Sequence, residues 1–469
     1  MSLEAEREIA RIKGAVIEMT APTEADRMKV SKAVEVIAKR VEQESKARNL
    51  NVRVEVEGSV AKDTWIAADR DIDVFIIFPH GTKKEEVKEL GLELAKAGAG
   101  NSWKLGFAEH PYVEAEVEGC TADIVPSSEM RQGDSVITSV DRTPLHTRFI
   151  TGKLDSTEKR NEVRVLKQFM KGIEVYGAEL KVGGFSGYLC ELLIVNYGSF
   201  EGVLRAAAQW RERTVIDICP ACSEKPAEEA FSAHLVIVDP VDSGRNAAAA
   251  VTVQSYSTFI SAARWFLKRP SIEFFLPPEE RPKPLELIDS IKRKGTAIVV
   301  ITTGCPNIPS DILWGEIHKS LRRVARMLEE SGFTVMDTAA WSDESDRIAL
   351  LIEADSKKIR KGRLHAGPKA WFMDEEEHFL GKYLCDSRVL AGPYMNGDRW
   401  YVELERDCTD LKDLIDRKMP ELELSEDVAE EVGKGFCVYE GKDLEELFED
   451  PGLGKAIAKF VRKKPPWLK

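Results

Sequence analysis

The sequence predicts an α+β fold built from several domains. The chain has 469 residues, enough for about three domains of ordinary size. Helical and alternating apolar patterns interleave between residues 22 and 127, whereas helical spacing dominates residues 158–270. A strand, a long helix and three further strands are then indicated between residues 296 and 405.

The first domain is expected to span residues 1–150 and to contain a helix-flanked mixed sheet. Residues 22–50 carry apolar residues at helical spacing behind a Thr-Glu start, which predicts a helix. The segment "NVRVEVEGS" (51–59) alternates and predicts a half-buried strand, and "DIDVFIIFP" (71–79) is apolar enough for a central strand. The remaining expected elements are a helix over residues 83–99 and, from residue 111, a strand, a Gly turn and a second strand that ends at Asp123.

Two further regions follow. Residues 151–275 are expected to form a mostly helical second domain, with glycine-rich breaks at "KVGGFSGY" and "DPVDSGRNAAAAV". Residues 276–469 are expected to form a third region. Its expected elements are a strand over 296–304, an amphipathic helix over 310–332, a hairpin over 333–354 and a strand over 398–405. This order matches the split β-α-β sheets that are common among RNA-binding modules.

Composition narrows the class of protein. No apolar run reaches membrane-spanning length, and the charged N-terminus lacks the apolar stretch of a signal peptide. Eight cysteines in so long a chain predict reduced thiols and a cytoplasmic protein rather than a disulfide scaffold. The formal net charge of −13 argues against non-specific nucleic-acid binding, so any RNA contact must come from local basic patches.

Two carboxylates open the predicted central strand. Asp71 and Asp73 are two residues apart, so both side chains leave the same face of a strand. Like charges this close repel unless a cation lies between them, and Mg²⁺ prefers carboxylate oxygens and substrate phosphates. Asp123, in "TADIVPS", is the candidate third carboxylate from a neighbouring strand. Three such groups would complete a two-metal site for phosphoryl displacement.

A Gly-Ser pair lies just ahead of these carboxylates. The Gly58–Ser59 turn would let backbone N–H groups and a hydroxyl approach a triphosphate, and Lys62 adds positive charge. The alternative is that the two Asp residues only cap a strand or pair with Arg70. Gly-Ser, Asp-x-Asp and a later lone Asp before a Pro resemble the nucleotidyltransferase superfamily together, whereas Asp-x-Asp alone is common.

Further segments make the resemblance narrower: "AEHPYVEAEV", "SVDRTPLHTRFI", residues 161–200 and "VIVDPVDSGRNAAAAV". They resemble the archaeal-type (class I) tRNA CCA-adding enzymes, from about residue 5 to 270 and then through "GPKAWF" and "GKYLC". The resemblance implies a nucleotidyltransferase head with a palm-like mixed sheet, a helical neck, and a body and tail that bind tRNA. The tail would cover roughly residues 305–385.

The resemblance also implies roles for individual residues. The family's metal carboxylates match Asp71, Asp73 and Asp123, and the first of them is often Glu in relatives. The positions that match the family's nucleotide-binding residues are Gly58, Ser59, Lys62, His146, Lys167, Tyr176 and Arg245. Arg245 matches the arginine that helps to recognise the incoming base, where a forked donor suits a base edge.

Each of the later residues also has a structural alternative from its local sequence alone. His146 could be a surface turn residue after Thr-Pro, and Lys167 could be solvated on an amphipathic helix. Tyr176 could be a core aromatic residue, and Arg245 could cap a helix or form a salt bridge. The role of His110 stays open. Cys219 and Cys222 form a lone "CPAC", which favours two reduced thiols over a zinc site because two more ligands are missing.

Basic runs indicate the RNA partner. The segment "SKKIRKGRLHAGPKAW" concentrates positive charge beside an aromatic residue, and "KAIAKFVRKKPPWLK" at the C-terminus is a second run. Each run alone is more often a solvated surface. The expected tRNA-binding residues are Lys357, Lys358, Arg360, Lys361 and Arg363. Recognition of shape and backbone would suit the acceptor stem and T arm of a tRNA.

The sequence therefore predicts an ATP(CTP):tRNA nucleotidyltransferase that uses Mg²⁺, ATP and CTP to add CCA without a template. The resemblance also implies a homodimer. One rival is a poly(A) polymerase or other RNA-tailing enzyme, which would use ATP alone. A rival of another class is a catalytically silent RNA-binding protein on the same fold, although such a protein would have no need for three carboxylates.

Overall fold

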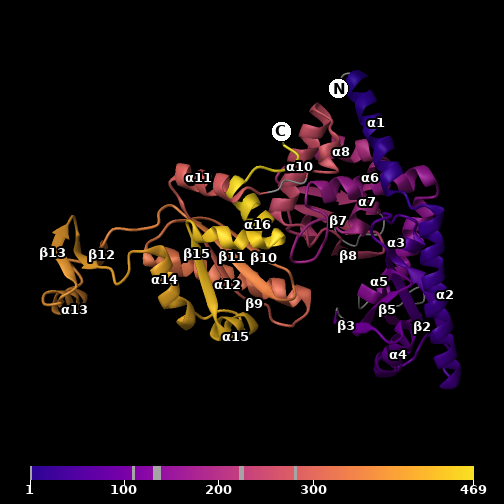
Figure 1. Ribbon diagram of the computed structural model, residues 1–469, viewed down its shortest axis with the longest axis horizontal. Helices are drawn as coiled ribbons and strands as arrows, with labels where there is room; N and C mark the ends of the chain where they lie inside the picture. Colours follow the sequence, from indigo (N-terminus) through magenta and orange to yellow (C-terminus); the bar gives the residue numbers. More distant parts are fainter. Residues whose placement is uncertain (1–2, 108–110, 130–138, 221–226, 279–281, 469) are drawn as a thin grey trace. The chain divides into compact units, whose positions relative to one another are not determined.

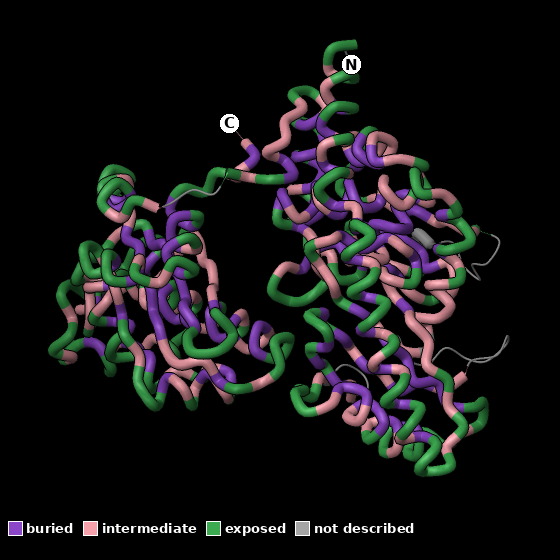
Figure 2. Tube along the Cα trace, turned by 45° about the vertical axis from the view of Figure 1, so that its right-hand side comes forward, coloured by how far each residue is buried: buried purple, intermediate pink, exposed green. Residues whose placement is uncertain are grey.

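The computed structural model describes residues 3–107, 111–129, 139–220, 227–278 and 282–468. These residues divide into two compact units (Figure 1). The N-terminal unit comprises Met1–Pro278 together with Pro465–Lys469, and the C-terminal unit comprises Glu279–Lys464. Figure 2 shows buried residues gathered inside each unit, so each unit has cores of its own.

The elements of the N-terminal unit are, in chain order, α1 (Leu3–Thr20), α2 (Glu24–Ala47), β1 (Arg53–Glu57), α3 (Gly58–Ala61), β2 (Asp71–Phe78), α4 (Lys84–Ala99), β3 (Trp103–Phe107), β4 (Pro111–Val117), β5 (Cys120–Ser128), α5 (Ser139–Lys153), α6 (Thr157–Gly172), α7 (Gly187–Tyr197), α8 (Phe200–Ala207), β6 (Thr214–Asp217), α9 (Ala227–Ala230), β7 (Leu235–Asp239), β8 (Asp242–Asn246), α10 (Val253–Lys268) and η2 (Ile272–Phe274).

The first sheet is five-stranded, with the order β1-β2-β5-β4-β3. Strands β2 and β5 run parallel and the other neighbours are antiparallel, which confirms the predicted mixed sheet. Helices α2 and α4 pack apolar residues against one face of it. Thr23 caps α2 in a capping box with Asp26, as the Thr-Glu start suggested. The covered face leaves the opposite face for the polar residues of β2 and β5.

The rest of the N-terminal unit is mainly helical. Its core is an aromatic cluster in which Phe169 of α6 lies 5.4–5.9 Å, centroid to centroid, from Phe200, Phe266, Phe274 and Phe275. A three-stranded sheet, β6-β7-β8, also lies here, and the sequence did not predict it. Its strands have only four or five residues: β7 is an apolar run too short to be told from buried helix by periodicity, and β8, with the sequence DSGRN, has no apolar pattern.

The elements of the C-terminal unit are, in chain order, α11 (Pro284–Lys294), β9 (Ala297–Gly304), α12 (Ser310–Ser331), β10 (Val335–Ser342), β11 (Arg347–Ala354), β12 (Gly362–Lys369), α13 (Met373–Tyr383), β13 (Val389–Asn396), β14 (Arg399–Glu405), α14 (Leu411–Lys418), η3 (Met419–Glu421), α15 (Glu426–Lys434), β15 (Phe436–Glu440), η4 (Asp443–Glu449) and α16 (Pro451–Arg462).

The main sheet of this unit has the order β10-β11-β9-β15. Strand β11 lies between β9 and β10 and is antiparallel to both, so β9, α12 and β10 form the predicted split β-α-β unit. Val299 and Ile301 pack against α12, whereas Ile298 and Val300 pack against α16 and α11 on the other face. Helices thus pack against both faces of this sheet.

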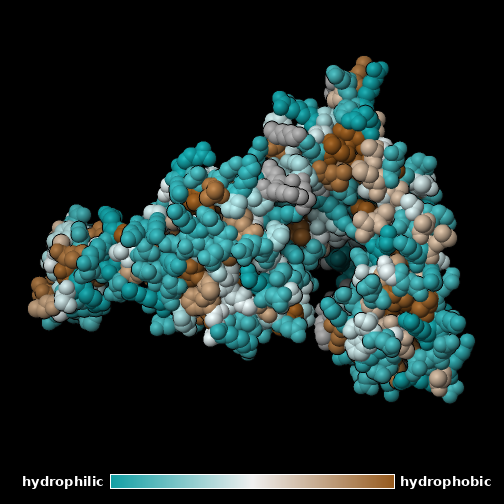
Figure 3. Space-filling view, in the orientation of Figure 1, coloured by the Kyte–Doolittle hydropathy of each residue, from teal (hydrophilic) through white to brown (hydrophobic). Residues whose placement is uncertain are grey.

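A second, three-stranded sheet, β12-β14-β13, packs against α13. Its small core consists of Phe379 and Tyr383 of α13 with Val402 and Leu404 of β14. Figure 3 shows a largely hydrophilic surface on the C-terminal unit. Hydrophobic patches interrupt it, and some of them lie on this sheet and its helix. Exposed apolar side chains in this part are Leu364, Trp371, Phe372, Met373, Leu390, Tyr394 and Met395.

The α+β, multidomain fold class that the sequence predicted is confirmed, with helices and strands in both units. The chain returns to the N-terminal unit at its end, where buried Trp467 stacks on Phe274 with a centroid distance of 5.2 Å. In the described part of the chain, no helix combines the length and the apolar character needed to cross a membrane.

Candidate active site

Four carboxylates cross the first sheet in one row. Asp73 of β2 lies directly opposite Asp123 of β5, and Asp123 lies opposite Glu114 of β4. On the other side, Asp73 lies opposite Glu57 of β1. Residues directly opposite one another in neighbouring strands project from the same face. We call Glu57, Asp73, Asp123 and Glu114 the acidic row; Asp71 lies on the same face, one pleat before Asp73.

The acidic row is electrostatically strained. Burial raises the pKa of Asp73 and the charge of Asp71 adds to this, although Lys62 and Lys167 oppose it. Burial raises the pKa of Asp123 to about 7, with further contributions from the charges of Asp73, Glu114 and Asp71. Such a cluster is unfavourable on its own, which is typical of a functional site rather than of a structural one.

The donor chemistry of the acidic row fits a hard divalent cation, because its members offer only carboxylate oxygens. Glu57 adds a further indication: it is buried, and its Oε2 atom has no hydrogen-bond partner among the residues that the structure describes. Within the same described ranges, however, no three His, Cys, Asp or Glu side chains are grouped closely enough to hold a metal ion. The support for the metal prediction therefore comes from the strand register, which places the carboxylates on one face of the sheet. It does not come from a preformed set of ligands.

The Gly58–Ser59 turn lies against the acidic row. Strand β1 ends at Glu57, and Gly58 begins the short helix α3 with a φ angle of +65°. A Cβ atom at Gly58 would lie 1.8 Å from Oδ2 of Asp73. Only glycine accommodates both this backbone angle and this approach, so the turn places Ser59 beside the carboxylates. Arg70, the alternative partner of these carboxylates, instead pairs with Asp26 at 2.8 Å.

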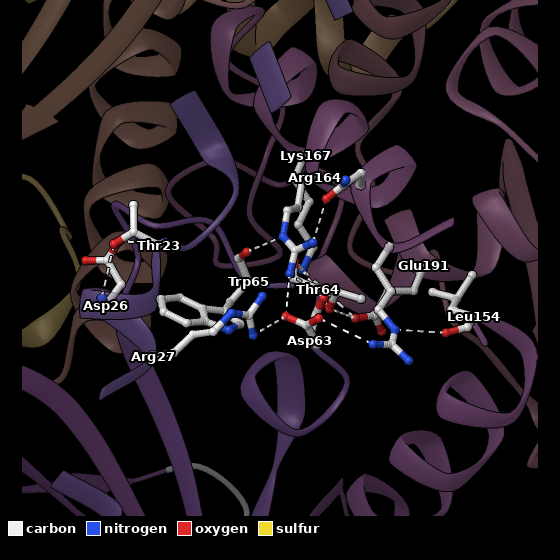
Figure 4. A network of polar contacts seen from close by, with 12 residues as sticks. Thr23, Asp26, Arg27, Asp63, Thr64, Trp65, Leu154, Arg164, Lys167 and Glu191 are labelled. Atoms are coloured by element: carbon white, nitrogen blue, oxygen red, sulfur yellow. Dashed lines mark hydrogen bonds and ion pairs between the residues drawn. The ribbon is translucent and has the colours of Figure 1, made fainter. Parts of the chain in front are cut away.

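The two predicted phosphate lysines meet at one buried carboxylate. Nζ of Lys62 lies 2.6 Å from Oε2 of Glu191, and Thr64 donates a hydrogen bond to the other oxygen. Nζ of Lys167 donates to the Thr64 carbonyl at 3.0 Å and lies 3.9 Å from Glu191 (Figure 4). Lys167 is almost fully buried, so the alternative of a solvated lysine is wrong. Through these contacts, the two lysines connect the loop at residues 62–70, which precedes β2, with Glu191 of α7.

A basic face of α6 holds this loop. Arg160, Arg164, Lys167 and Lys171 are spaced four, three and four residues apart, so they share one face of the helix. Arg164 donates to the Trp65 carbonyl at 2.9 Å and to the Asp63 carboxylate at 2.6 Å (Figure 4), and Lys171 pairs with Asp69. The loop at residues 62–70 connects the Gly58–Ser59 turn with β2, so α6 sets the path between the two predicted parts of the site.

Tyr176 lies beside Lys167. A Cβ atom at Gly187 would lie 3.1 Å from the Tyr176 hydroxyl and 3.4 Å from Nζ of Lys167, so both polar groups converge on the start of α7. The Tyr176 ring packs on the aromatic core and takes a contact from Lys171 at 5.2 Å. The alternative of a core aromatic residue is therefore correct for the Tyr176 ring, whereas its hydroxyl lies near the amine of Lys167.

His146 and Arg245 meet at a second buried carboxylate, Asp239 at the end of β7. Nε2 of His146 and Nη1 of Arg245 lie 2.9 and 2.8 Å from Oδ2 of Asp239. His146 belongs to helix α5, so the alternative of a surface turn is wrong. Arg245 forms a salt bridge with Asp239, which was one of the structural alternatives that the sequence left open for this residue. The structure therefore joins these two predicted nucleotide-binding residues through a residue that sequence reasoning missed.

The predicted RNA-binding run lies in the C-terminal unit and is partly neutralised. Its exposed lysines pair with carboxylates: Lys357 with Glu440 at 2.5 Å, Lys358 with Asp410 at 3.8 Å and Lys361 with Glu405 at 2.6 Å. Burial, and then the charges of Arg363 and Arg360, lower the pKa of Arg406. In the second basic run, Lys463 pairs with Asp337 and Glu353 and serves the fold.

Similarity to known proteins covers nearly the whole chain. The family model for a nucleotidyltransferase domain matches residues 34–146, that for the second domain of tRNA nucleotidyltransferase matches residues 161–276, and that for the C-terminal domain of the CCA-adding enzyme matches residues 294–441. The CCA-adding enzyme of Saccharolobus shibatae is 37% identical over 456 residues, which cover 97% of this chain and 99% of that protein. The chain belongs to the CCA-adding enzyme family.

Other members of this family are similarly related. The CCA-adding enzyme of Methanothermobacter thermautotrophicus is 38% identical over 86% of both chains. That of Methanosarcina acetivorans is 33% identical over 96% of this chain and 98% of its own. The resemblance inferred from sequence motifs is thus confirmed.

Two residues singled out by sequence, His110 and Cys222, cannot be placed relative to this site because they are not among the residues that the structure describes. Cys219 is disulfide-bonded, so the expectation of a reduced thiol at this position is wrong. The spacing "CPAC" alone does not distinguish reduced from oxidised cysteines, and the expectation rested on the inferred compartment.

Proposed function

We propose that this CCA-adding family member adds C, C and A to the 3′ end of tRNA, using CTP and ATP and releasing pyrophosphate. The observation that carries the proposal is the acidic row beside the Gly58–Ser59 turn. The terminal 3′-hydroxyl oxygen of the tRNA forms a bond to the α-phosphorus of the nucleotide. The bond to the bridging oxygen breaks, pyrophosphate leaves, and the hydroxyl proton passes to solvent.

Asp71, Asp73 and Asp123 would hold the metal, for which Mg²⁺ is the proposed ion. When bound, Mg²⁺ would lower the pKa of the attacking hydroxyl and neutralise charge on the triphosphate. The chain's own groups would orient the substrate: Gly58 lets the turn approach the nucleotide, and the Ser59 hydroxyl and backbone N–H groups would bind the phosphates. Lys62 and Lys167 contribute positive charge while fixed on Glu191.

The proposed partner is tRNA, held at its acceptor stem and T arm by the C-terminal unit. The positive charges of Arg360 and Arg363, which lower the pKa of Arg406, support this assignment because phosphate contacts supply much of the affinity for RNA. We also propose a cytoplasmic homodimer, as the family resemblance implies.

The direct test is the product ladder from a tRNA that lacks CCA. CTP alone should add two residues, ATP alone should add none, and both together should add three and then stop. Long tails made from ATP alone would instead identify an RNA-tailing polymerase. A tRNA that binds but is not extended under any condition would identify a silent RNA-binding protein.

Neutralising the basic run should weaken tRNA binding. In a variant with Lys357, Lys358, Arg360 and Lys361 all replaced by Gln, the slope of log Kd against log salt should fall by about 0.7–0.9 for each phosphate that the protein no longer neutralises. Titrations at several salt concentrations measure the slope. Lys418→Gln with Lys434→Gln is the matched control, since both lysines form surface ion pairs in the same unit. An unchanged slope would mean that the run is only a solvated face.

Arg245→Ala should impair nucleotide selection. Cytosine and adenine present acceptors where uracil and guanine present ring N–H donors, so a guanidinium favours the first pair. Removing one discriminating interaction of about 1–3 kcal/mol should reduce kcat/KM for CTP and ATP by roughly 5- to 150-fold and narrow the gap to UTP and GTP. Single-nucleotide incorporation with all four nucleotides measures this. An equal fall for all four, with a lower melting temperature, would show that Arg245 only anchors its hairpin.

A further inference from the structure

Asp239 is a fully buried carboxylate with four hydrogen-bond donors around it. Its Oδ2 atom accepts from His146 Nε2 at 2.9 Å and from Arg245 Nη1 at 2.8 Å. Its Oδ1 atom accepts from the Tyr188 hydroxyl at 3.1 Å and from the Val241 backbone N–H at 3.1 Å. A carboxylate has about four acceptor positions, so this set fills all of them. Asp239 therefore has no position left for a metal or a substrate proton.

The donors keep Asp239 ionised. Burial raises its pKa, but the hydrogen bonds from His146, Val241 and Arg245 outweigh burial and leave the pKa below its usual value. An ionised carboxylate only accepts, so Nε2 of His146 carries the hydrogen and Nδ1 is the nitrogen left for a ligand. The two other nitrogens of Arg245 likewise keep their N–H groups for a ligand, in a fixed plane.

Tyr188 completes the cluster. Its ring stacks on the His146 ring with centroids 3.9 Å apart and an interplanar angle of 22°. The ring also lies 5.7 Å from Nζ of Lys62, one of the proposed phosphate groups. Because Asp239 itself is fully buried while the Arg245 side chain is 36% exposed, the carboxylate acts from behind the residues that can reach a nucleotide.

We propose that Asp239 is a positioning residue that sets nucleotide selection by fixing His146 and Arg245. This inference rests on the proposed function, since it concerns the same nucleotide site. Losing the anchor leaves both side chains present but free to rotate, so a nucleotide must order them on binding. Affinity and discrimination should therefore fall more than the rate of the chemical step.

The experiment is Asp239→Asn in the full-length protein, with steady-state kinetics for CTP, ATP, UTP and GTP. In Asp239→Asn, an NH₂ group with two donors replaces one carboxylate oxygen that accepted two hydrogen bonds. Losing a hydrogen bond to a charged group changes equilibria by roughly 10- to 100-fold. KM for CTP and ATP should rise about tenfold and the CTP-to-UTP preference should fall about tenfold, with kcat changing less than threefold. Asp242→Asn is the matched control on the same hairpin, where Asp242 pairs with Arg142 at 3.3 Å.

A double variant separates positioning from a structural role. In the Arg245→Ala background, adding Asp239→Asn should lower the remaining CTP-to-UTP preference by less than about twofold, because the group it positions for base reading is gone. A full additional tenfold loss in that background would overturn the proposal. So would equal losses for all four nucleotides with an unchanged preference.

Tyr188→Phe provides a milder variant if Asp239→Asn does not fold. It keeps the ring on His146 and removes one donor to Asp239, so KM for CTP should rise about threefold at constant kcat. Unchanged KM would contradict the proposal. The unmodified protein is assayed in parallel: if it adds no CTP or ATP to tRNA, the proposed function fails, whereas a normal parent with a normal Asp239→Asn variant refutes only the positioning role.

Discussion

Replacing Asp73 with Asn is expected to abolish nucleotide addition while leaving tRNA affinity almost unchanged. Asp73 lies at the centre of the acidic row, opposite both Glu57 and Asp123 and against the Gly58 turn. A divalent cation contributes several kcal/mol of charge stabilisation, so its loss should reduce the rate on the order of a thousandfold or more. The RNA contacts proposed for the C-terminal unit do not involve this residue.

The same variant should be at least as thermally stable as the parent. Burial and the neighbouring Asp71 raise the pKa of Asp73, so its charged form opposes folding at neutral pH. A neutral amide of the same shape removes that penalty. Single-turnover extension, tRNA filter binding and a melting curve in metal-free buffer measure the three effects. Glu116→Gln is the matched control, since Glu116 lies opposite Thr121 on an adjacent strand and is exposed.

Asp73→Asn protein that extends tRNA at a rate near that of the parent would refute the metal assignment. A loss of activity together with a fall in melting temperature would instead point to a structural role. Asp71→Asn and Asp123→Asn should resemble Asp73→Asn, because the three carboxylates would share the same ions.

Local patterns in the sequence were enough to predict the first sheet, except for its edge strand β3, and the split β-α-β unit. The alternation of "NVRVEVE" and the apolar run of "DVFIIF" correspond to an edge strand and an interior strand. The Gly-Ser pair ahead of Asp-x-Asp predicted a turn whose backbone could approach a triphosphate, whereas the close approach of Gly58 to Asp73 is seen only in the structure. These features depend on residues close together in the chain.

The residues that sequence reasoning missed act across long separations. Glu191 stands within the apolar helix "GYLCELLIVNY", where one charged residue is the only signal, and its partner Lys62 is 129 residues away. Asp239 looks like a turn residue before Pro, yet it joins His146 and Arg245 from two different elements. Buried charges need partners, so each implied a contact, but only the fold identifies the partner.

Arg164→Met is expected to destabilise the N-terminal unit more than any other substitution proposed above. The Arg164 side chain is only 1% exposed and donates to the Asp63 carboxylate, to the Trp65 carbonyl and to Asn161. Methionine keeps the apolar stem but leaves the Trp65 carbonyl unpaired. Removing one partner of a buried ion pair destabilises by about 3–5 kcal/mol. Asp63 keeps Arg27 and Arg160 as partners, so the lower value, about 3 kcal/mol, is expected.

Arg160→Met is the matched control, because Arg160 pairs with the same carboxylate from one helical turn away at 3.3 Å and is partly exposed. Its loss should change stability by less than about 1 kcal/mol. Urea titrations of both variants at neutral pH measure the difference. Burial raises the pKa of Asp63, but the arginines, Arg164 first, lower it below its ordinary value, so the stability it provides is complete above the unfolded-state pKa of about 4. That contribution disappears as the pH falls through the folded-state pKa, and the gap between Arg164→Met and the parent should narrow there. Equal losses for the two arginines, or a gap that does not change in acid, would show that Arg164 acts through packing rather than through its hold on the loop at residues 62–70.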